Sequence, residues 1–375
     1  MPKRSIVIIL ASLESGGAQK VTISLFNKLN TDYKIYYFVL DKKNPYLKDE
    51  VSANHSVTFL ETTRDSVFIK ILKTSKFIRK IKPDLLYSTM NKTNQIGLLA
   101  KILSLSKSPF IIREANFLSL KYPNESKFKK ALLRYLYNKI ASKIIVISNE
   151  MERDLVKNFG IYKDKMALIH NPLDFNLIEE KLSRKPNPMP KKVFNLLVVG
   201  RLVQQKNFRF VIHAIDELKV SMPNVYLTIL GDGPELADLR NLVKELNLTK
   251  YVLFKGLTDN PYPYYKNADI FVSSSLWEGF PNSLLEAMAC QSCVISFDCK
   301  SGPKEILTNK LNHLLVPIND SEKFNNLVLE LYNNKELLAR FSHLCYERAK
   351  EFSIDKVFYK FDELIKEQVK LKYCD

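Results

Sequence analysis

The 375-residue sequence is poor in the features that usually signal disulfide bonds, metal sites or membrane-spanning helices. Its five cysteines are an odd number for so long a chain, which is typical of reduced thiols in the cytosol. Cys290, Cys293 and Cys299 cluster without a second Cys pair or a His nearby, and the five histidines form no recognisable catalytic triplet. No apolar run approaches the roughly 20 residues that a spanning helix needs. We therefore expect inert thiols, no protein-bound metal and no spanning helix.

The length and composition predict two folded domains. Hydrophobic residues make up 46% of the chain and charged residues 26%, which is typical of a globular protein. A chain of this length exceeds one ordinary hydrophobic core and suits two. Pro186, Pro188 and Pro190 stand at alternate positions near its middle, where they exclude helix and strand. We expect the segment 182–190 to be the interdomain linker.

The net charge of +17 lies almost entirely in the first half. Residues 1–185 hold 33 basic and 17 acidic side chains, whereas residues 186–375 hold 24 and 23. Such asymmetry predicts that the first half faces a polyanionic surface, either a membrane or a nucleic acid.

Two segments of the first half, Ser66–Lys80 and Lys127–Ile140, read as basic amphipathic helices. The first carries Lys70, Lys73, Lys76, Arg79 and Lys80 beside apolar residues, and the second carries Lys127, Lys129, Lys130, Arg134 and Lys139. Such helices can lie on an anionic membrane. The alternative is an ordinary domain helix with a solvated cationic face.

Apolar strand-like runs alternate with helix-like segments along the first half. Ser5–Leu13 could instead be a short signal peptide, but we disfavour this interpretation because the apolar run is short and no convincing cleavage site follows. Alternation of this kind predicts a parallel sheet covered by helices on both faces. The expected strands are Ile6–Leu10, Ile35–Leu40, Val57–Leu60, Leu85–Ser88, Phe110–Ile112 and Ile144–Ile147, with helices at Ala18–Leu29, Ser66–Lys80, Asn94–Leu103 and Lys127–Ile140.

The second half centres on a strand, a turn and a helix that carry two glutamates. Ala268–Ser275 reads as a buried strand, and Leu284, Leu285 and Met288 recur at helical spacing. Glu278 therefore lies in the turn and Glu286 in the helix. A carboxylate at the carboxyl end of a parallel strand can accept hydrogen bonds from a ligand above the sheet.

Several short sequence motifs of the second half occur in the same order in a known protein family. Gly256-Leu257, Ala268-Asp269, the pair Glu278 and Glu286, and Ser301–Glu305 together resemble the C-terminal domain of family-four retaining glycosyltransferases. The resemblance implies the α/β GT-B fold, which consists of two facing doubly wound, Rossmann-like domains. It implies an acceptor-binding domain over 1–185, a nucleotide-sugar domain over 186–354, and a last helix at about 355–375 that packs back on the first domain.

The resemblance also assigns roles to individual residues. Arg201 and Lys206 match the family's diphosphate-binding cations, and Glu278 matches the glutamate that contacts donor-sugar hydroxyls. These three are the expected catalytic residues. Glu286 matches the glutamate that accepts from the ribose hydroxyls. The other expected donor-binding residues are Gly16, Gly17, Gly200, Gly231, Leu257, Gly279, Phe280, Pro281, Asn282, Ser283 and Leu284.

The acceptor side is less defined by sequence. Ala115 stands where many members of the family have a histidine, so no histidine of this loop is assigned. Asn91, Arg113 and Asn116 follow predicted strands, and we expect them to line the acceptor cleft.

The expected activity is retaining transfer of a sugar from a nucleoside-diphosphate sugar, with UDP as the expected nucleoside diphosphate. The expected acceptor is a hydroxyl of a membrane lipid-linked oligosaccharide or of a surface-glycan precursor. No metal or other cofactor is expected, because no Asp-x-Asp pair appears in a metal-binding setting. We expect a cytoplasmic protein, peripheral on the inner membrane face and without a nucleic-acid partner. The alternatives are a GT-B nucleotide-sugar epimerase or hydrolase, and a non-catalytic basic protein that binds membrane or RNA.

Overall fold

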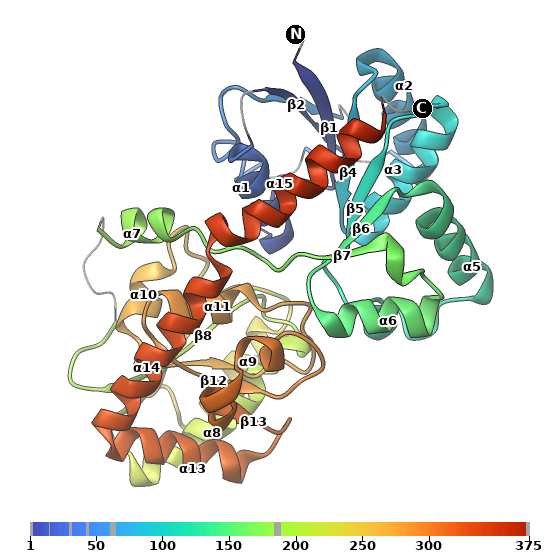
Figure 1. The fold of residues 1–375 in the computed structure, drawn as a ribbon. Coiled ribbons are helices and arrows are strands. Elements are labelled where there is room, and N and C mark those ends of the chain that lie inside the picture. The colour runs from blue at the N-terminus through green and yellow to red at the C-terminus, as the bar shows by residue number, and fades with distance from the viewer. Residues whose placement is uncertain are drawn as a thin grey trace. The chain divides into compact units, whose positions relative to one another are not determined.

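The computed structural model describes residues 3–14, 16–29, 32–42, 45–60, 65–183 and 189–372. The chain divides into two compact units (Figure 1). Unit 1 comprises Met1–Pro172 and Ile354–Asp375, and unit 2 comprises Leu173–Ser353.

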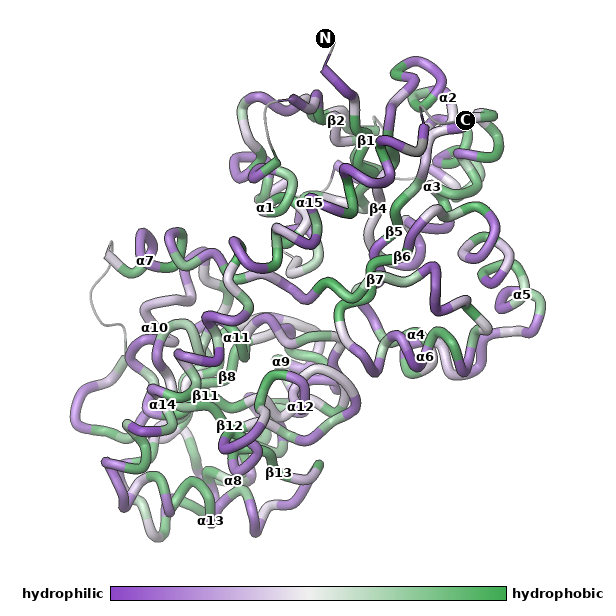
Figure 2. Tube along the Cα trace, viewed as in Figure 1, coloured by the Kyte–Doolittle hydropathy of each residue, from purple (hydrophilic) through white to green (hydrophobic). Residues whose placement is uncertain are grey.

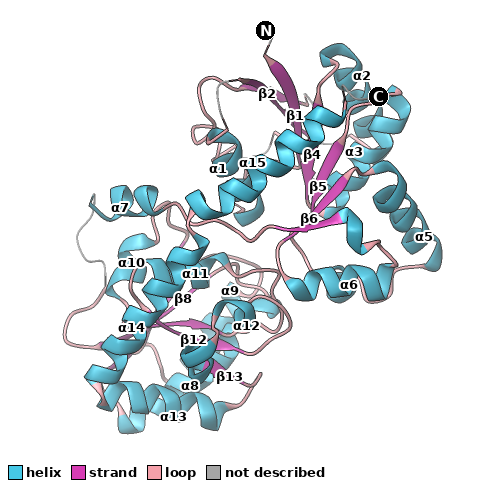
Figure 3. Ribbon diagram, in the orientation of Figure 1, coloured by secondary structure: helices cyan, strands magenta, loops and turns pink. Residues whose placement is uncertain are grey.

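The described part of unit 1 contains a seven-stranded parallel sheet in the order β3-β2-β1-β4-β5-β6-β7 (Figure 3). Each strand is followed by a crossover, which is why the sheet is parallel. The strands are β1 (Arg4–Leu10), β2 (Tyr33–Val39), β3 (Ser56–Phe59), β4 (Leu85–Thr89), β5 (Phe110–Arg113), β6 (Lys143–Val146) and β7 (Met166–Leu168).

Helices cover both faces of this sheet. On one face α1 (Gly17–Asn27) and α15 (Ile354–Leu371) pack on alternate strand residues, and Phe26 meets Phe361 edge to face at 5.2 Å. On the other face α2 (Val67–Ile81) packs against α3 (Asn91–Ser104). The remaining helices of this unit are α4 (Leu118–Lys121), α5 (Lys127–Tyr135), the π-helix η1 (Leu136–Ile140), α6 (Asn149–Phe159) and the 3₁₀ turn η2 (Lys163–Lys165).

The helix expected over Lys127–Ile140 is not one regular α-helix. It is α-helical to Tyr135 and then widens into η1, where the amide of Ala141 bonds to the carbonyl of Leu136. The wider turn buries Leu136, Tyr137 and Asn138. Such π-turns are frequent at functional sites.

The described part of unit 2 contains a six-stranded parallel sheet in the order β10-β9-β8-β11-β12-β13. Its strands are β8 (Phe194–Val199), β9 (Val225–Leu230), β10 (Val252–Gly256), β11 (Ile270–Ser273), β12 (Cys293–Phe297) and β13 (Leu315–Val316). Its helices are α7 (Phe175–Ser183), η3 (Gln204–Lys206), α8 (Phe208–Ser221), α9 (Leu236–Glu245), α10 (Tyr262–Asn267), α11 (Asn282–Ala289), α12 (Pro303–Ile306), η4 (Asn309–Leu314), α13 (Ser321–Asn333), α14 (Lys335–Ala349) and η5 (Lys350–Phe352).

The two units use the same connection beside their central strands. In unit 1, Asp84 before β4 accepts from the amide of Ser5 in β1 at 2.7 Å. In unit 2, Asp269 before β11 accepts from the amide of Asn195 in β8, also at 2.7 Å. Asp269, one of the residues behind the family resemblance, thus aligns two strands.

The boundary between the units differs from the one expected after Lys185. Unit 1 ends at Pro172, and α7 belongs to unit 2, where it packs against α10 and where Asn260 Nδ2 donates to the carbonyl of Lys181 at 2.8 Å. The sequence of α7 does not by itself indicate that this helix packs against α10. Residues 184–188 of the expected linker lie outside the described residues.

Candidate functional site

Three glycines meet at the carboxyl edge of the unit 2 sheet. Gly200, Gly231 and Gly256 end β8, β9 and β10 or follow them directly. A Cβ on Gly231 would lie 1.8 Å from the carbonyl oxygen of Gly200, and the amide of Gly231 bonds to the carbonyl of Gly256 at 2.9 Å. The backbones can approach this closely because the residues lack side chains. Glycine at these positions therefore leaves backbone atoms, rather than side chains, at the carboxyl edge of the sheet.

Lys206 and Glu278 form an ion pair at this edge. Lys206 Nζ lies 2.5 Å from Glu278 Oε1, and both side chains are largely buried. The stem of Lys206 passes over Gly200, where an added Cβ would lie 3.2 Å from Lys206 Cε. Ser275 Oγ donates to the same Glu278 oxygen at 2.6 Å. A charge-assisted pair with a further hydroxyl donor holds Glu278 in one orientation.

Backbone contacts fix the turn that carries Glu278. Gln205 Nε2 donates to the carbonyl of Trp277 at 2.7 Å, and the amide of Leu276 donates to the carbonyl of Gln205 at 2.8 Å. From the other side, Ser301 Oγ donates to the carbonyl of Gly279 at 2.9 Å. The loops after β8, β11 and β12 are therefore joined around Glu278.

The second glutamate is held by a buried tyrosine. Tyr265 Oη in α10 donates to Glu286 Oε2 in α11 at 3.1 Å. Burial and the neighbouring charge of Glu286 raise the pKa of Tyr265 well above its usual value. The hydroxyl therefore stays protonated and can keep donating to this carboxylate.

The structure separates the other expected donor residues into exposed and buried groups. Arg201 is exposed on the loop after β8, and Leu257 is 78% exposed after β10. Phe280 and Leu284 are buried, so they can reach a ligand through their backbone. Gly279, Pro281, Asn282 and Ser283 form the turn and first residues of α11.

Gly16 and Gly17 lie in unit 1, at the start of α1. Gly16 is the N-cap and Gly17 the first helical residue, with no acidic side chain in the first turn. Free amides at such a helix end favour an anion. Ser15, beside them, lies outside the described residues.

Asn91 and Arg113, expected in the acceptor cleft, are buried at the carboxyl edge of the unit 1 sheet. Asn91 begins α3, and its Nδ2 donates to Tyr137 Oη at 3.3 Å. Arg113 Nη2 donates to Asn171 Oδ1, and burial lowers the Arg113 pKa. Asn116 is half-buried in the loop after β5.

Sequence reasoning missed Glu114, which stands between these residues. Glu114 is fully buried, and its Oε1 accepts from Tyr137 Oη and from Asn94 Nδ2, the latter at 2.9 Å. Burial raises the Glu114 pKa to about 7. The signal was present, because a carboxylate directly after a buried strand is the same feature that singled out Glu278.

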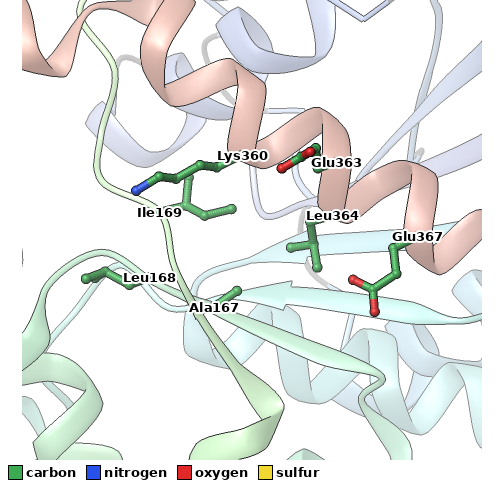
Figure 4. A pocket seen from close by; sticks show the side chains of 7 residues that line it. All are labelled: Ala167, Leu168, Ile169, Lys360, Glu363, Leu364 and Glu367. Atoms are coloured by element: carbon green, nitrogen blue, oxygen red, sulfur yellow. The ribbon is translucent and has the colours of Figure 1, made fainter.

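A separate cleft lies between β7 and α15 in unit 1 (Figure 4). Lys360, Glu363 and Glu367 of α15 line one side, and Ala167, Leu168 and Ile169 line the other. It contains none of the expected site residues.

Two family models match the chain almost from end to end. The model described as Glycosyltransferase Family 4 matches residues 15–177, and the model described as Glycosyl transferases group 1 matches residues 179–348. Their junction falls close to the division between the two units.

Named relatives are transferases of bacterial glycans. The chain is 32% identical over 95% of its length, and 97% of the relative's, to the N-acetylgalactosamine-N,N'-diacetylbacillosaminyl-diphospho-undecaprenol 4-alpha-N-acetylgalactosaminyltransferase of Campylobacter jejuni. It is 25% identical to the UDP-Gal:alpha-D-GlcNAc-diphosphoundecaprenol alpha-1,3-galactosyltransferase of Escherichia coli, covering 86% of each chain. In fold it matches Anabaena HepE, solved with UDP-glucose, at a TM-score of 0.84 and 18% identity, covering 97% of this chain and 99% of HepE.

The two parallel-sheet units and these matches define a glycosyltransferase of the GT-B fold. Within that class, the chain belongs to glycosyltransferase family four.

Two expectations concern absences. Across the described ranges, no helix is long and apolar enough to cross a membrane.

The structure describes four buried free thiols, those of Cys290, Cys293, Cys299 and Cys345. Burial and the nearby charge of Glu278 raise the pKa of Cys299 to about 12. These thiols therefore stay protonated.

Proposed function

We propose that the protein transfers a sugar, with retention of anomeric configuration, from a UDP-sugar to a hydroxyl of a lipid-linked saccharide. The observation that carries this proposal is the Glu278 carboxylate, held by Lys206 and Ser275 at the glycine-lined edge of the unit 2 sheet. Ligands of doubly wound folds bind at this edge. The relatives in C. jejuni and E. coli are named for acceptors on diphospho-undecaprenol, which supports the same acceptor class here.

In this proposal each residue stabilises one part of the donor. Glu278 accepts hydrogen bonds from sugar hydroxyls, and Glu286 accepts from the ribose hydroxyls. Arg201 and Lys206 offset the charge that develops on the leaving diphosphate. Gly16 and Gly17, at the start of α1 in unit 1, present amides that favour an anion.

The reaction is same-face substitution. The bond between the anomeric carbon and the donor phosphate oxygen breaks, and the acceptor oxygen bonds to that carbon on the same face. The departing phosphate oxygen takes the acceptor's proton. The proposed route needs no covalent intermediate. Glu278 instead orients the sugar, and Lys206 and Ser275, which both bind its Oε1, hold the carboxylate in place.

We propose further that this transfer needs no metal ion. Lys206 and Arg201 supply cationic charge on the loop that follows β8. These groups replace the function that a divalent cation has on a diphosphate.

We also propose that unit 1 binds an anionic membrane from the cytoplasmic side, through the surface that α2 forms. Lys76, Arg79 and Lys80 are exposed there, and Val67 and Phe68 at the start of α2 are 62% and 67% exposed. Figure 2 shows hydrophilic and hydrophobic residues mixed along α2 and α5. Phe128 in α5 is 77% exposed among lysines. Cations flanking exposed apolar residues suit an anionic lipid surface on the cytoplasmic side.

The relatives' names favour transfer over an epimerase, a hydrolase or a non-catalytic binding protein. A thermal-shift panel of nucleotide sugars tests the donor. We expect UDP-sugars to raise Tm and the matching GDP- and ADP-sugars to leave it unchanged, because a ligand stabilises the state that binds it. A shift with GDP-sugars alone would contradict the UDP assignment.

A further inference from the structure

A buried carboxyl in unit 1 has one oxygen that no atom of the described residues satisfies. Glu114 Oε1 accepts from Tyr137 Oη and Asn94 Nδ2, whereas Glu114 Oε2 is buried without a hydrogen-bond partner. An unsatisfied buried oxygen destabilises the folded state and is uncommon, so its presence needs an explanation.

Hydrogen bonds from neighbouring side chains fix the Oε1 side of the Glu114 carboxyl. Asn94 is fixed in turn by Ser88 Oγ, which donates to Asn94 Oδ1 at 2.7 Å. Tyr137 sits on η1, the widened turn that carries it into the core. Asn91 Nδ2 donates to Tyr137 Oη, and Gln95 Nε2 donates to Asn91 Oδ1 at 2.8 Å. Several elements thus meet to orient one carboxyl.

The place of this cluster in the fold is where ligands bind. Glu114 follows β5 directly, and α3 starts after β4, so the cluster lies at the carboxyl edge of the parallel sheet. The chain before α3 adopts an uncommon conformation, with Met90 at φ 76°. Backbone strain of this kind collects at functional sites.

We propose that Glu114 is an acceptor-recognition residue, whose Oε2 accepts a hydrogen bond from one hydroxyl of the acceptor saccharide. This inference rests on the proposed transfer to a saccharide acceptor and adds the residue that reads it. A sugar hydroxyl supplies the donor that Oε2 lacks. Lys121 at the end of α4 lies near enough for its charge to lower the Glu114 pKa, and burial together with the charge of Glu114 raises the Tyr122 pKa.

Protonation supports this role. Burial raises the Glu114 pKa to about 7, against hydrogen bonds from Tyr137, Asn94 and Asn91 and the charge of Lys121. The other titratable neighbour on β5 is Arg113. Above pH 7 the ionised carboxylate accepts strongly from the hydroxyl, and below pH 7 the protonated carboxyl is a weaker acceptor. Acceptor binding should therefore weaken as pH falls through about 7.

The test compares Glu114→Gln with Tyr137→Phe. Glutamine keeps an oxygen for Tyr137 and Asn94 but puts an NH₂ group in the place of Oε2. We expect its KM for acceptor to rise about 10- to 100-fold, with the KM for donor unchanged. Tyr137→Phe removes a hydrogen bond that lowers the Glu114 pKa but keeps Oε2. At a pH well above that pKa its acceptor KM should therefore change less than about threefold. The wild-type rise in acceptor KM below pH 7 should disappear in Glu114→Gln.

Acceptors that lack single hydroxyls make the test specific. We expect one deoxy acceptor to bind the wild-type protein about 10- to 100-fold more weakly than the parent acceptor. The affinity for this deoxy acceptor should fall little further in Glu114→Gln, because the missing hydroxyl and the substitution remove the same hydrogen bond. The inference is wrong if every deoxy acceptor binds the wild-type protein with an affinity within threefold of the parent acceptor. It is also wrong if the loss of affinity from the missing hydroxyl and the loss from Glu114→Gln multiply when the two changes are combined. If wild type transfers nothing to any saccharide, the proposed function fails first and this inference falls with it.

Discussion

The ammonium of Lys206 lies 2.5 Å from Oε1 of Glu278, although 72 positions separate them in the sequence. The pair joins the loop after β8 to the turn before α11, at the edge where β8, β9 and β10 end in glycine or are followed by it. Its position couples the proposed diphosphate-binding cation to the proposed sugar-binding carboxylate. A change at either residue therefore alters both.

Glu278→Gln should nearly abolish transfer and leave the fold intact. Glutamine can still accept from Lys206 and Ser275, but it loses the charge that strengthens bonds to sugar hydroxyls. The loss of about 2–4 kcal/mol corresponds to roughly 30- to 1000-fold in turnover. Steady-state kinetics and a melting curve measure both effects. Glu245→Gln, an exposed change at the end of α9, is the matched control. Turnover of Glu278→Gln within threefold of wild type would remove Glu278 from the site.

Gly231→Ala should destabilise unit 2 far more than Gly256→Ala. The new Cβ at Gly231 would lie 1.8 Å from the carbonyl oxygen of Gly200, whereas nothing lies within 4 Å of a Cβ at Gly256. Gly256 has φ 79°, so its substitution costs about 1–2 kcal/mol in backbone strain alone. We expect Gly231→Ala to exceed this and to lower the urea midpoint further. Equal midpoints for the two variants would show that the strands do not approach as described.

Exhaustive treatment with EDTA should leave the transfer rate within about twofold. In the proposed reaction the cations Arg201 and Lys206 supply the counter-charge to the diphosphate. Rates measured before and after chelation, and after adding back Mg²⁺ or Mn²⁺, decide the point. Complete loss with EDTA and recovery with either metal would refute metal independence.

The protein should sediment with anionic liposomes at low salt and dissociate at high salt. Replacing Lys76, Lys80 and Lys127 by Ser should weaken binding about 100-fold, because each cation near the surface contributes about 1 kcal/mol. The matched control replaces Lys244, Lys250 and Lys335, which are exposed on unit 2. Nucleotide affinity should not change in either variant. A wild-type protein that ignores anionic liposomes at low salt would favour an acceptor that is not held in a membrane.

The sequence predicted the sheets better than the sites. Alternation of buried strands with helices predicts two parallel sheets, because the crossover rules leave few other arrangements. It cannot show that α7 packs on α10 beyond the expected boundary, or that the helix ending at Ile140 widens to bury Tyr137. Both depend on contacts between residues distant in sequence.

The same limit explains the site residues. Glu278 was predictable, since a strand, a turn and a resemblance all point to it. Ser275 was not singled out, because a hydroxyl three positions before Glu278 gives no sign in the sequence that it bonds to that carboxylate. The sequence places Glu114 after a strand, but it does not show that one of its oxygens is buried without a partner among the described residues. Leu284 was expected at the donor, but its side chain belongs to the core.

The most direct measurement of the central claim is transfer from a UDP-sugar to a saccharide carried on diphospho-polyprenol. Mass spectrometry reports the added sugar, and NMR reports the configuration of the new linkage. The account predicts an acceptor enlarged by one sugar residue that keeps the anomeric configuration of the donor. Release of free sugar without an enlarged acceptor, or an inverted linkage, would contradict it.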